Sequence, residues 1–505
     1  MISTSDTFIN IILSGLIALV SHFLWNYIRS PLKSFPGPLV TSFTDLWRLL
    51  DVYNRRCDIT HLRLHRKHGG AVRMGPNVLS LSDPSMVNRV YSTKNPWEKS
   101  SMYSVNDVMV NGTRVSNLFS TRDETWHSTI IRPVKSLYSM TRVQDAEHSV
   151  DTAIQLYFEK LQERFVSTGR PCDMADYMLY FAWDAMSQIT FSETLGVLNA
   201  GCDDQKFLET STRSLDYFAP ICQIPGLDLL LDKNPIQRVG PPTFGWANVF
   251  SLQMYQKRLE QGPRGPNAKT DFLDKFIELK KKRPDLVDDN AVITYLLSNV
   301  LAGSDTTAIS LCSVMYHVLK HRSVYQRLRE ELDTAQLALP ASWKEVQKLP
   351  YLDAVMRESM RIHPGVGLML ERIVPEGGLT LPDGRFVPAG TVVGMNPWVI
   401  NRDADIFGPD VDSFIPERWL KQEGETDEEF NTRRARMKGA DLTFGAGSRM
   451  CMGRYLSQLE SYKLIATMFS KFDMELANPK NEWKIINSWF VRQENIPVVL
   501  KERVR

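Results

Sequence analysis

The amino-acid sequence predicts a mainly α-helical protein with small β-sheets, preceded by an N-terminal transmembrane helix. Three observations lead to this fold class. Residues 8–28 form an uncharged apolar run, residues 289–321 form an apolar run without proline, and short β-branched runs broken by Gly and Pro turns occur at 71–81 and 379–397. The first two runs are too long for ordinary strands, and the last two are typical of hairpins. Because 43% of the 505 residues are hydrophobic, one large buried core is expected.

The overall composition limits the classes of function. The formal net charge is only +2 and no basic tail is present, so we expect no binding of nucleic acid. The six cysteines are scattered, and no two have C-x-x-C spacing. These features indicate a reducing compartment and argue against both a disulfide framework and a tetrahedral zinc site.

The chain divides into three expected parts: a membrane anchor over residues 1–29, a Pro-rich hinge over 30–38 and one large domain over 39–505. No low-complexity linker or internal repeat divides the large domain further. The apolar run is long enough to cross a bilayer core at about 1.5 Å per residue. The alternatives are a cleaved signal peptide, which would have a basic start and a shorter apolar region, and a buried core helix.

The charges beside the apolar run predict its orientation. Asp6 is the only charged residue before the run, whereas Arg29 and Lys33 follow it. The positive-inside rule therefore predicts a single-pass protein whose large domain is cytosolic.

A glycine-rich loop at Phe444–Gly453 presents one cysteine, Cys451, immediately before an apolar helical run. Glycines permit close approaches that side chains forbid, so the loop can fold tightly under a flat, bulky ligand. Backbone N–H groups freed by such a turn can hold the sulfur as a thiolate, and Arg449 can pair with an acidic substituent of the ligand. The alternative is an ordinary buried thiol. The full spacing Phe-x-x-Gly-x-Arg-x-Cys-x-Gly favours a metal-bound thiolate.

The predicted long central helix carries a polar interruption at Ala302-Gly-Ser-Asp-Thr-Thr307. Burying a carboxylate inside an apolar helix costs free energy, so Asp305 is expected to have a functional role. Thr306 can bond back to the preceding turn, and Gly303 allows a neighbouring group to approach the backbone. The combination predicts a groove in which Asp305 and Thr306 relay protons. The alternative is a buried polar network that only shapes the helix.

A cluster of buried charges is expected to support the cysteine loop. Glu358 and Arg361 are three residues apart on a predicted helix that ends at His363-Pro364, so they share one face. Arg418, in the segment Pro416-Glu-Arg-Trp419, can complete a Glu/Arg/Arg cluster.

These four motifs together make the chain resemble a cytochrome P-450, a haem-thiolate monooxygenase, over essentially its whole length. Their order and spacing agree with the membrane-anchored microsomal type, and the stretches at 375–378 and 388–396 look most like fungal members of the pisatin demethylase and benzoate hydroxylase kind. The resemblance implies a helix-rich triangular domain whose long central helix crosses a bound haem b.

The resemblance also implies roles for the matching residues. Cys451 would be the proximal iron ligand, with Phe444 packed beside its sulfur. Glu358, Arg361 and Arg418 would hold the proximal core together. Asp305 and Thr306 would be the acid and alcohol that deliver protons for O2 activation. The residues that it places against the haem are Phe444, Arg449, Gly453, Arg372 and Ala302.

One position departs from the family pattern. Similar enzymes carry an Arg four residues after a Trp or His to bind the haem propionates, but Ile130 and Ile131 stand four residues after Trp126 and His127. Arg132 is the nearest substitute, and we expect it to act with His127.

The expected reaction inserts one atom of O2 into a hydrophobic small molecule, giving hydroxylation, epoxidation or O-dealkylation. A secondary-metabolite intermediate is the preferred substrate class, and an aromatic compound undergoing detoxification is the alternative. The substrate pocket is expected to border Val105–Phe119, Phe218, the central helix, Val366–Leu370 and Trp489-Phe490.

The resemblance implies several partners. The chain contains no nucleotide motif, so electrons are expected from a separate NADPH-dependent flavoprotein reductase, for which the basic run Arg433, Arg434, Arg436 and Lys438 is a candidate docking patch. The anchor implies contact with membrane lipid, in the endoplasmic reticulum. The rival classes are a haem-thiolate isomerase that needs no O2 and a non-catalytic haem sensor. The intact acid–alcohol pair argues against both.

Overall fold

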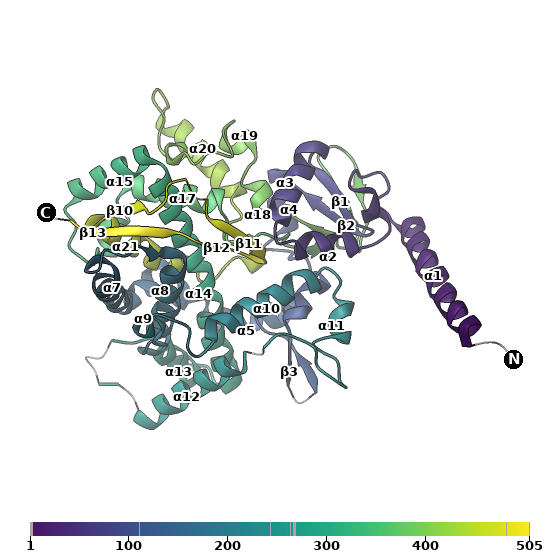
Figure 1. The fold of residues 1–505 in the computed structure, drawn as a ribbon, viewed down its shortest axis with the longest axis horizontal. Coiled ribbons are helices and arrows are strands. Elements are labelled where there is room, and N and C mark those ends of the chain that lie inside the picture. The colour runs from purple at the N-terminus through teal and green to yellow at the C-terminus, as the bar shows by residue number, and fades with distance from the viewer. Residues whose placement is uncertain are drawn as a thin grey trace.

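The structure, a computed structural model, describes residues 4–110, 112–242, 244–262, 264–265, 269–480 and 482–503. The prediction of a mainly helical chain with small sheets is confirmed (Figure 1). The helices are α1 (Thr4–Arg29), α2 (Leu46–Tyr53), α3 (Cys57–His68), α4 (Val87–Val90), α5 (Glu124–Val134), α6 (Met140–Val143), α7 (Glu147–Leu161), α8 (Met174–Phe191), α9 (Val197–Ala200), α10 (Phe207–Ile221), α11 (Gly226–Leu230), α12 (Gly245–Gln261), α13 (Phe272–Lys282), α14 (Asp289–Lys320), α15 (Arg322–Ala335), α16 (Trp343–Val346), α17 (Pro350–Ile362), α18 (Pro397–Ile400), α19 (Ala404–Phe407), α20 (Asp427–Ala440) and α21 (Arg454–Lys471).

The strands form small sheets at the edges of the helical body. A four-stranded sheet has the order β1-β2-β9-β6, a three-stranded sheet has the order β10-β13-β5, and three hairpins pair β3 with β4, β7 with β8 and β11 with β12. The strands are β1 (Ala71–Gly75), β2 (Val78–Leu81), β3 (Val108–Val110), β4 (Thr113–Val115), β5 (Cys172–Asp173), β6 (Arg372–Ile373), β7 (Leu379–Thr380), β8 (Phe386–Val387), β9 (Val392–Gly394), β10 (Phe472–Leu476), β11 (Lys484–Ser488), β12 (Phe490–Glu494) and β13 (Pro497–Glu502). The two hairpins expected at 71–81 and 379–397 are present as β1–β2 and β7–β8.

The predicted central helix is α14, and it is the organising element of the fold. It begins after Asp288, whose side chain caps the helix by accepting a hydrogen bond from the N–H of Ala291, and it runs without interruption to Lys320. It packs against α8, α12, α13, α17 and α21 (Figure 1). Apolar residues from all these helices belong to one continuous buried core, so α14 is held on several sides by elements far apart in sequence.

The N-terminal helix α1 extends away from the body (Figure 1). It contains an apolar span from Ile12 to Arg29 that is long enough to cross a membrane and of which no part is buried in the structure. A helix of this kind fits a microsomal membrane anchor. The end of α1 contacts the body through Tyr27, whose ring stacks on Phe43 with centroids 5.1 Å apart.

The segment expected to be a hinge is bonded to the β1–β2 sheet. Leu32 and Phe35 are buried, and the N–H of Arg73 on β1 donates a 2.7 Å hydrogen bond to the carbonyl oxygen of Pro36. The guanidinium of Arg385 lies 4.6 Å from the centre of the Phe35 ring. Residues 30–38 therefore connect α1 to the sheet by a fixed path.

The stretch at 97–121 contains local structure. A 3-10 turn, η3, spans Ser101–Asn106, and β3 and β4 form a hairpin in which Val110 pairs with Thr113. Gly112 has φ 75°, a left-handed conformation that suits a tight hairpin turn. The short apolar and β-branched runs on either side of this turn were too brief to identify as strands from the sequence.

Candidate active site

The cysteine loop folds as its glycines predict, although one glycine is needed for a different contact. Gly445 and Gly447 have φ values of 66° and 70°. A Cβ atom at Gly447 would lie 2.1 Å from the carbonyl oxygen of Tyr91, so this glycine allows the loop to pack on the chain after α4. The N–H of Cys451 donates a 2.8 Å hydrogen bond to the carbonyl oxygen of Phe444, which closes the loop just before α21.

Cys451 combines an accessible side chain with crowded surroundings. It is exposed, yet the protein atoms around it are dense enough that burial raises the pKa of its thiol. The backbone N–H groups of Gly453 and Arg454, at the start of α21, act in the opposite direction and lower this pKa. A thiol that is accessible, enclosed and approached by backbone donors is suited to act as a thiolate ligand.

Glu358, Arg361 and Arg418 come together in one buried cluster. Arg361 donates to both carboxylate oxygens of Glu358 at 2.8 Å, and Arg418 donates to Glu358 Oε1 at 2.9 Å. The side chains of Glu358 and Arg361 are fully buried. Burial alone would raise the pKa of Glu358, but the two arginines outweigh it and the pKa is lowered. Trp419 adds a 2.9 Å hydrogen bond to Glu358 Oε2.

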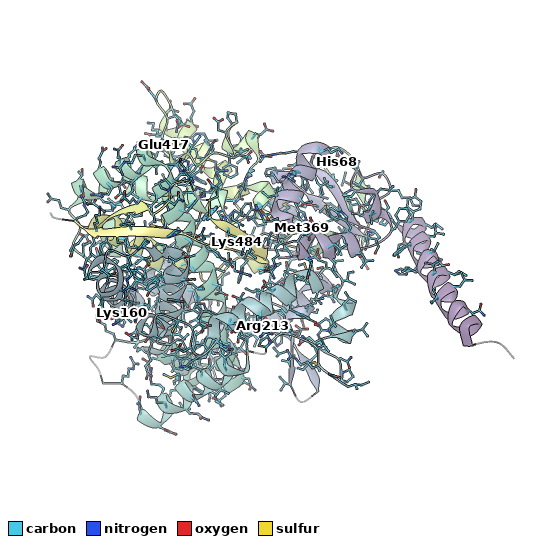
Figure 2. The ribbon with its side chains drawn as sticks, in the orientation of Figure 1. His68, Lys160, Arg213, Met369, Glu417 and Lys484 are labelled. Atoms are coloured by element: carbon cyan, nitrogen blue, oxygen red, sulfur yellow. The ribbon has the colours of Figure 1, made fainter. Side chains whose placement is uncertain are left out.

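The turn that supplies Arg418 and Trp419 is held from its other side as well. This turn, η7, spans Pro416–Trp419. Glu417, labelled in Figure 2, accepts hydrogen bonds of 2.9 Å from Tyr351 of α17 and from Arg327 of α15. The charged cluster is thus fixed between α15, α17 and η7.

Asn401 connects this cluster to the cysteine loop. Arg361 donates a 2.9 Å hydrogen bond to the carbonyl oxygen of Asn401. The buried amide of Asn401 donates to Asp441 Oδ1 at 3.2 Å and to Thr443 Oγ1 at 3.3 Å, and it accepts from the N–H of Leu442 at 3.1 Å. Sequence reasoning missed Asn401, because nothing local distinguishes it from an ordinary turn residue.

The polar interruption of α14 has one accessible face. Ala302 is exposed and Thr306 is partly exposed, although most of their neighbours along the helix are buried. The Thr306 hydroxyl donates a 2.8 Å hydrogen bond to the carbonyl oxygen of Ala302. Thr307, the residue after Thr306, donates a 3.4 Å hydrogen bond from its hydroxyl to Ser457 Oγ on α21, six residues after Cys451. The accessible face of α14 and the cysteine loop therefore lie close together.

Asp305 and Thr306 point in different directions. Asp305 is held by Trp183 Nε1 of α8 at 2.9 Å and by Ser211 Oγ of α10 at 2.6 Å. Burial raises the pKa of Asp305, and these two hydrogen bonds oppose the rise. Gly303 admits the Met186 side chain, whose sulfur would lie 2.8 Å from a Cβ atom at that position. Trp183 and Ser211 are partners that the sequence did not reveal.

A buried group of cations lies beside the cysteine loop. Arg372 and Lys99 are each 5% exposed, and they face each other across an antiparallel bridge between the β6 strand and the segment before η3. Arg449 pairs with Glu124 at 2.8 Å. Burial lowers the pKa of Lys99 well below its usual value, and Arg372 and Arg449 lower it further. Among the described residues, only Glu124 forms an ion pair with one of these three cations. The group therefore lacks negative charge.

Arg132 is not part of this group. It lies exposed on α5, whereas His127 is buried. The step of five positions from one to the other corresponds to a rotation of about 140° around the helix, so the two side chains leave roughly opposite sides. Burial lowers the pKa of His127 to about 3, with further lowering by Arg449 and Lys99, so His127 is a neutral neighbour of the cations. Of the two basic residues, Lys99 and not Arg132 lies beside Arg372.

The residues expected to border a substrate pocket form an aromatic cluster beside these cations. Phe119 contacts Trp489 edge-to-face with centroids 5.4 Å apart, and Phe218 contacts Trp489 at 5.5 Å. Tyr103, missed from the sequence, packs on Phe119 at 5.4 Å. The Lys99 ammonium lies 3.9 Å from the centre of the Tyr103 ring, which places the cluster next to the cations.

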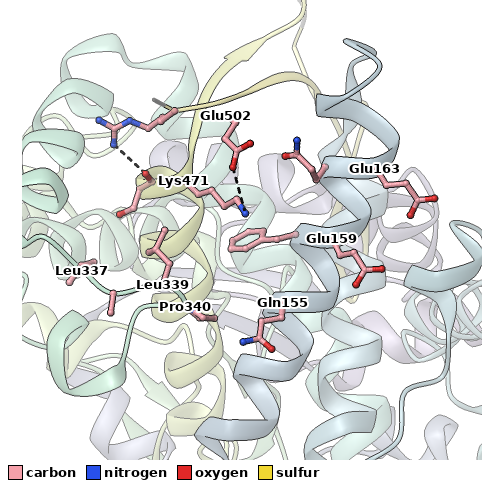
Figure 3. A pocket seen from close by; sticks show the side chains of 13 residues that line it. Gln155, Glu159, Glu163, Leu337, Leu339, Pro340, Lys471 and Glu502 are labelled. Carbon is pink, nitrogen blue, oxygen red and sulfur yellow. Dashed lines mark hydrogen bonds and ion pairs between the residues drawn. The ribbon is translucent and has the colours of Figure 1, made fainter. Parts of the chain in front are cut away.

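The site fits a flat group that carries two carboxylates. Arg372, Arg449 and Lys99 share a single ion-paired carboxylate, Glu124, and an accessible thiol and an accessible helix face lie close to them. The described residues contain no group of three or more His, Cys, Asp or Glu side chains able to hold a metal ion without a cofactor. A surface hollow between α7, the end of α21 and β13 (Figure 3) is a separate feature, because neither Cys451 nor any of the three cations Arg372, Arg449 and Lys99 lines it.

The basic run of α20 is engaged in local contacts. Arg433 pairs with Glu425 at 2.8 Å and donates to two carbonyl oxygens, and Arg434 pairs with Asp353 at 3.1 Å. Both arginines therefore contribute to folding, and less of their charge is free than the sequence suggests.

Comparison with known proteins agrees with this geometry. The cytochrome P450 family model matches residues 44–500. The chain is 38% identical over 493 residues to cytochrome P450 monooxygenase cfoH of Aspergillus candidus, an alignment that covers 97% of this chain and 91% of that protein. It is 37% identical over 482 residues to cytochrome P450 monooxygenase cicH of Emericella nidulans, covering 94% and 95%, and 37% identical over 491 residues to cytochrome P450 monooxygenase pkfB of the same organism, covering 96% and 94%. The resemblance to fungal haem-thiolate enzymes is confirmed, and the chain belongs to the cytochrome P450 family as a monooxygenase.

Proposed function

We propose that this enzyme hydroxylates, epoxidises or O-dealkylates a hydrophobic small molecule, an intermediate of secondary metabolism, with Cys451 as the thiolate ligand of haem b. The observation that supports this most strongly is the accessible but enclosed Cys451, approached by the N–H groups of Gly453 and Arg454 and adjacent to the accessible face of α14. When bound, haem b supplies the iron at which O2 is reduced and one oxygen atom is transferred to the substrate.

In this proposal the cationic group holds the two propionates of the haem. The side chains of Arg372, Arg449 and Lys99 are buried and share one carboxylate, Glu124, so two further carboxylates would stabilise their charged forms. Glu124 keeps Arg449 in position with a 2.8 Å ion pair. Gly453 and Ala302 carry little or no side chain, which leaves room for a flat macrocycle.

Thr306 and Asp305 are the proposed proton relay. The reaction consumes two electrons and two protons and releases one oxygen atom as water, so protons must reach the site from solvent. The Thr306 hydroxyl lies on the accessible face, and Asp305 has a raised pKa that keeps a proton available nearer to neutral pH. Ser211, bonded to Asp305 at 2.6 Å, can pass a proton from the α10 side.

The N-terminal helix and the aromatic cluster both support a membrane-associated location. Residues 1–29 would anchor the enzyme in the lipid of the endoplasmic reticulum membrane, and the catalytic domain over 39–505 would face the cytosol. A hydrophobic substrate that partitions into lipid suits both this anchor and the aromatic cluster around Trp489. Electrons would come from an NADPH-dependent flavoprotein reductase in the same membrane.

Product formation tests this proposal. The full chain is reconstituted with a reductase, NADPH and lipid, and candidate aromatic, polyketide and terpenoid compounds are supplied with isotopically labelled O2. We expect one labelled oxygen atom in the product and no product without reductase. Turnover that continues without O2 would indicate an isomerase or dehydratase, and spectral binding of every compound without turnover under any condition would indicate a sensor.

A further inference from the structure

Asp305 is contacted from α8 beside a point of close helix packing. The helix α8 lies next to α14 (Figure 1), and a Cβ atom at Gly303 of α14 would lie 2.8 Å from the sulfur of Met186 of α8. Trp183 comes three residues before Met186, and Asp305 comes two residues after Gly303. Because the helices are in contact there, Trp183 Nε1 reaches Asp305 Oδ1 and donates a 2.9 Å hydrogen bond.

The ring of Trp183 is held in place by its surroundings. Among the described residues, it is the largest side chain that is fully buried. Its ring centroid lies 5.9 Å from that of Trp246 on α12, and Trp246 in turn stacks on Phe207 of α10 with centroids 4.2 Å apart. An indole packed in this way keeps one orientation, because turning it would open a void or create a clash. Trp183 Nε1 is therefore a fixed donor to Asp305.

The two carboxylate oxygens of Asp305 have partners of different chemistry. Oδ1 accepts from Trp183, whose indole N–H can only donate, so this oxygen cannot carry a proton while the bond is present. Oδ2 accepts a 2.6 Å hydrogen bond from the buried hydroxyl of Ser211, a group that can either donate or accept. A protonated Asp305 can therefore keep both bonds only when its proton is on Oδ2.

From this difference we infer that Trp183 is a positioning residue of the proton relay, which keeps Oδ1 as an acceptor and directs the transferable proton of Asp305 to Oδ2. The inference rests on the proposed relay through Asp305 and Thr306, and it names the residue that orients the acid. In the protonated acid, Oδ2–H donates to Ser211. In the carboxylate, Ser211 donates to Oδ2, so this hydrogen bond is present in both protonation states while the bond to Trp183 stays unchanged.

The electrostatics around Asp305 give the direction of the effect that Trp183 should have. Burial raises the pKa of Asp305. The hydrogen bonds from Ser211 and Trp183 oppose this rise, and the charge of Arg492 on β12 adds a smaller effect of the same sign. The guanidinium of Arg492 is itself paired with Asp216 of α10 at 2.9 Å. Loss of the Trp183 bond should therefore raise the pKa of Asp305 further and leave its carboxyl free to rotate.

Infrared titration of the full chain in lipid tests this inference without turnover. The C=O stretching band of protonated Asp305 is identified as the band that is missing in Asp305→Asn, and its loss is followed as the pH rises. In Trp183→Phe, which keeps an aromatic ring and removes the N–H, the midpoint should move to higher pH by about one unit. Replacement of Trp183 by benzothienylalanine, which keeps the shape of the indole without its N–H, should give the same shift with less change in packing.

Trp343→Phe is the matched control. Trp343 on α16 is 6% exposed, and its Nε1 has no hydrogen-bond partner among the described residues. This variant removes a buried indole N–H as Trp183→Phe does, but far along the chain from Asp305. The Asp305 band should keep the midpoint of the parent.

Peroxide released per NADPH consumed, measured with reductase, tests the same residue in the relay. Trp183→Phe should release about threefold more peroxide than the parent, in line with loss of an oriented proton donor. In the Asp305→Asn background the same substitution should add nothing, because Trp183 acts through Asp305.

The possible results are distinguishable. A midpoint in Trp183→Phe equal to that of the parent would overturn the inference and leave the monooxygenase proposal intact, as would an additive effect on peroxide in the double variant. Peroxide release in Asp305→Asn equal to that of the parent would overturn the relay and the inference with it. Absence of a thiolate-type carbon monoxide band in the parent would overturn the haem assignment, and the infrared midpoints would still decide whether Trp183 holds Asp305.

Discussion

Arg361 donates a 2.9 Å hydrogen bond to the carbonyl oxygen of Asn401, whose side chain in turn bonds Asp441, Leu442 and Thr443 just before the cysteine loop. The loop is therefore not held only by its own turns. A fully buried Glu358–Arg361 pair fixes the backbone of Asn401, and the amide of Asn401 fixes the segment that leads to Phe444. The position of Cys451 depends on this path, because its N–H is bonded to the carbonyl oxygen of Phe444.

Asn401→Ala should loosen the cysteine loop. The substitution leaves the buried partners at Leu442 and Thr443 without the Asn401 amide, which costs about 1–3 kcal/mol of stability. We also expect faster haem loss. In the reduced carbon monoxide spectrum, a larger fraction of the haem should lack the absorption band of thiolate ligation. Asn77→Ala, which removes an exposed 2.9 Å hydrogen bond to Gly390, is the matched control and should change neither property. Equal haem retention in both variants would contradict the bracing role.

Lys99→Met should weaken haem binding, while Lys99→Arg should largely restore it. The reason is electrostatic, because Lys99 is one of three buried cations that share one carboxylate. The readout is the rate of haem transfer to an excess of an apo-haemoprotein acceptor, which does not depend on activity. We expect transfer to be about tenfold faster for Lys99→Met, equivalent to about 1.4 kcal/mol. Arg132→Met removes the exposed arginine of α5 and should have no effect; the reverse ranking of the two variants would show that Arg132 is the haem contact.

Thr306→Ala should uncouple electron consumption from product formation. Its hydroxyl is the proposed donor on the accessible face of α14, so its loss leaves O2 reduction without a positioned proton. The measurement is the ratio of hydrogen peroxide to product at equal NADPH consumption, which we expect to rise severalfold. Thr294→Ala removes a similar back-bond, 2.8 Å to the carbonyl oxygen of Asn290, from an exposed part of the same helix and should leave the ratio unchanged. A ratio in Thr306→Ala equal to that of the parent would refute the relay.

Glu460→Gln should remove a pH dependence of stability. Burial in α21 raises the pKa of Glu460 to about 8, and neither carboxylate oxygen accepts a hydrogen bond from the described residues. The folded state therefore binds the proton more tightly than the unfolded state, whose pKa is near 4.5. The resulting stability is fully present below the unfolded pKa and is lost as the pH rises through the folded value, a change of a few kcal/mol.

Denaturant unfolding at about pH 5 and about pH 8 checks this prediction, since these values lie near the two ends of the window. The parent should lose stability between them, and Glu460→Gln should lose much less. Glu475→Gln, on the exposed side of β10, is the control and should behave like the parent. A parent and a Glu460→Gln variant with the same pH dependence would show that Glu460 is not a buried neutral carboxyl.

The elements with long or repeated patterns were predictable from the sequence. The apolar run at 289–321 became α14, and the turn signals at 71–81 became β1–β2. Each depends on a local periodicity and on nearby caps or turns, which the chain itself displays. The Glu358-x-x-Arg361 spacing likewise placed two groups on one helical face, and the structure brings them together with Arg418.

The partners contributed by distant segments were not predictable. Lys99 reaches Arg372 only because the segment before η3 pairs with β6, and this pairing joins residues more than 270 positions apart. Trp183 and Ser211 meet Asp305 because α8 and α10 lie beside α14. Arg132 looked suitable from its distance along the chain, but the helical rotation turns it outward. Such contacts arise from tertiary packing, for which one sequence gives no spacing rule.

The reduced carbon monoxide spectrum of Cys451→Ala, compared with the parent and with Cys202→Ala, tests the central claim most directly. Cys202 is the other exposed cysteine of the chain, and it lies between α9 and α10, outside the site. We predict that the parent and Cys202→Ala show the absorption band of a thiolate-bound haem and that Cys451→Ala, with haem present, does not. A thiolate-type band that persists unchanged in Cys451→Ala would contradict the assignment of Cys451 as the iron ligand.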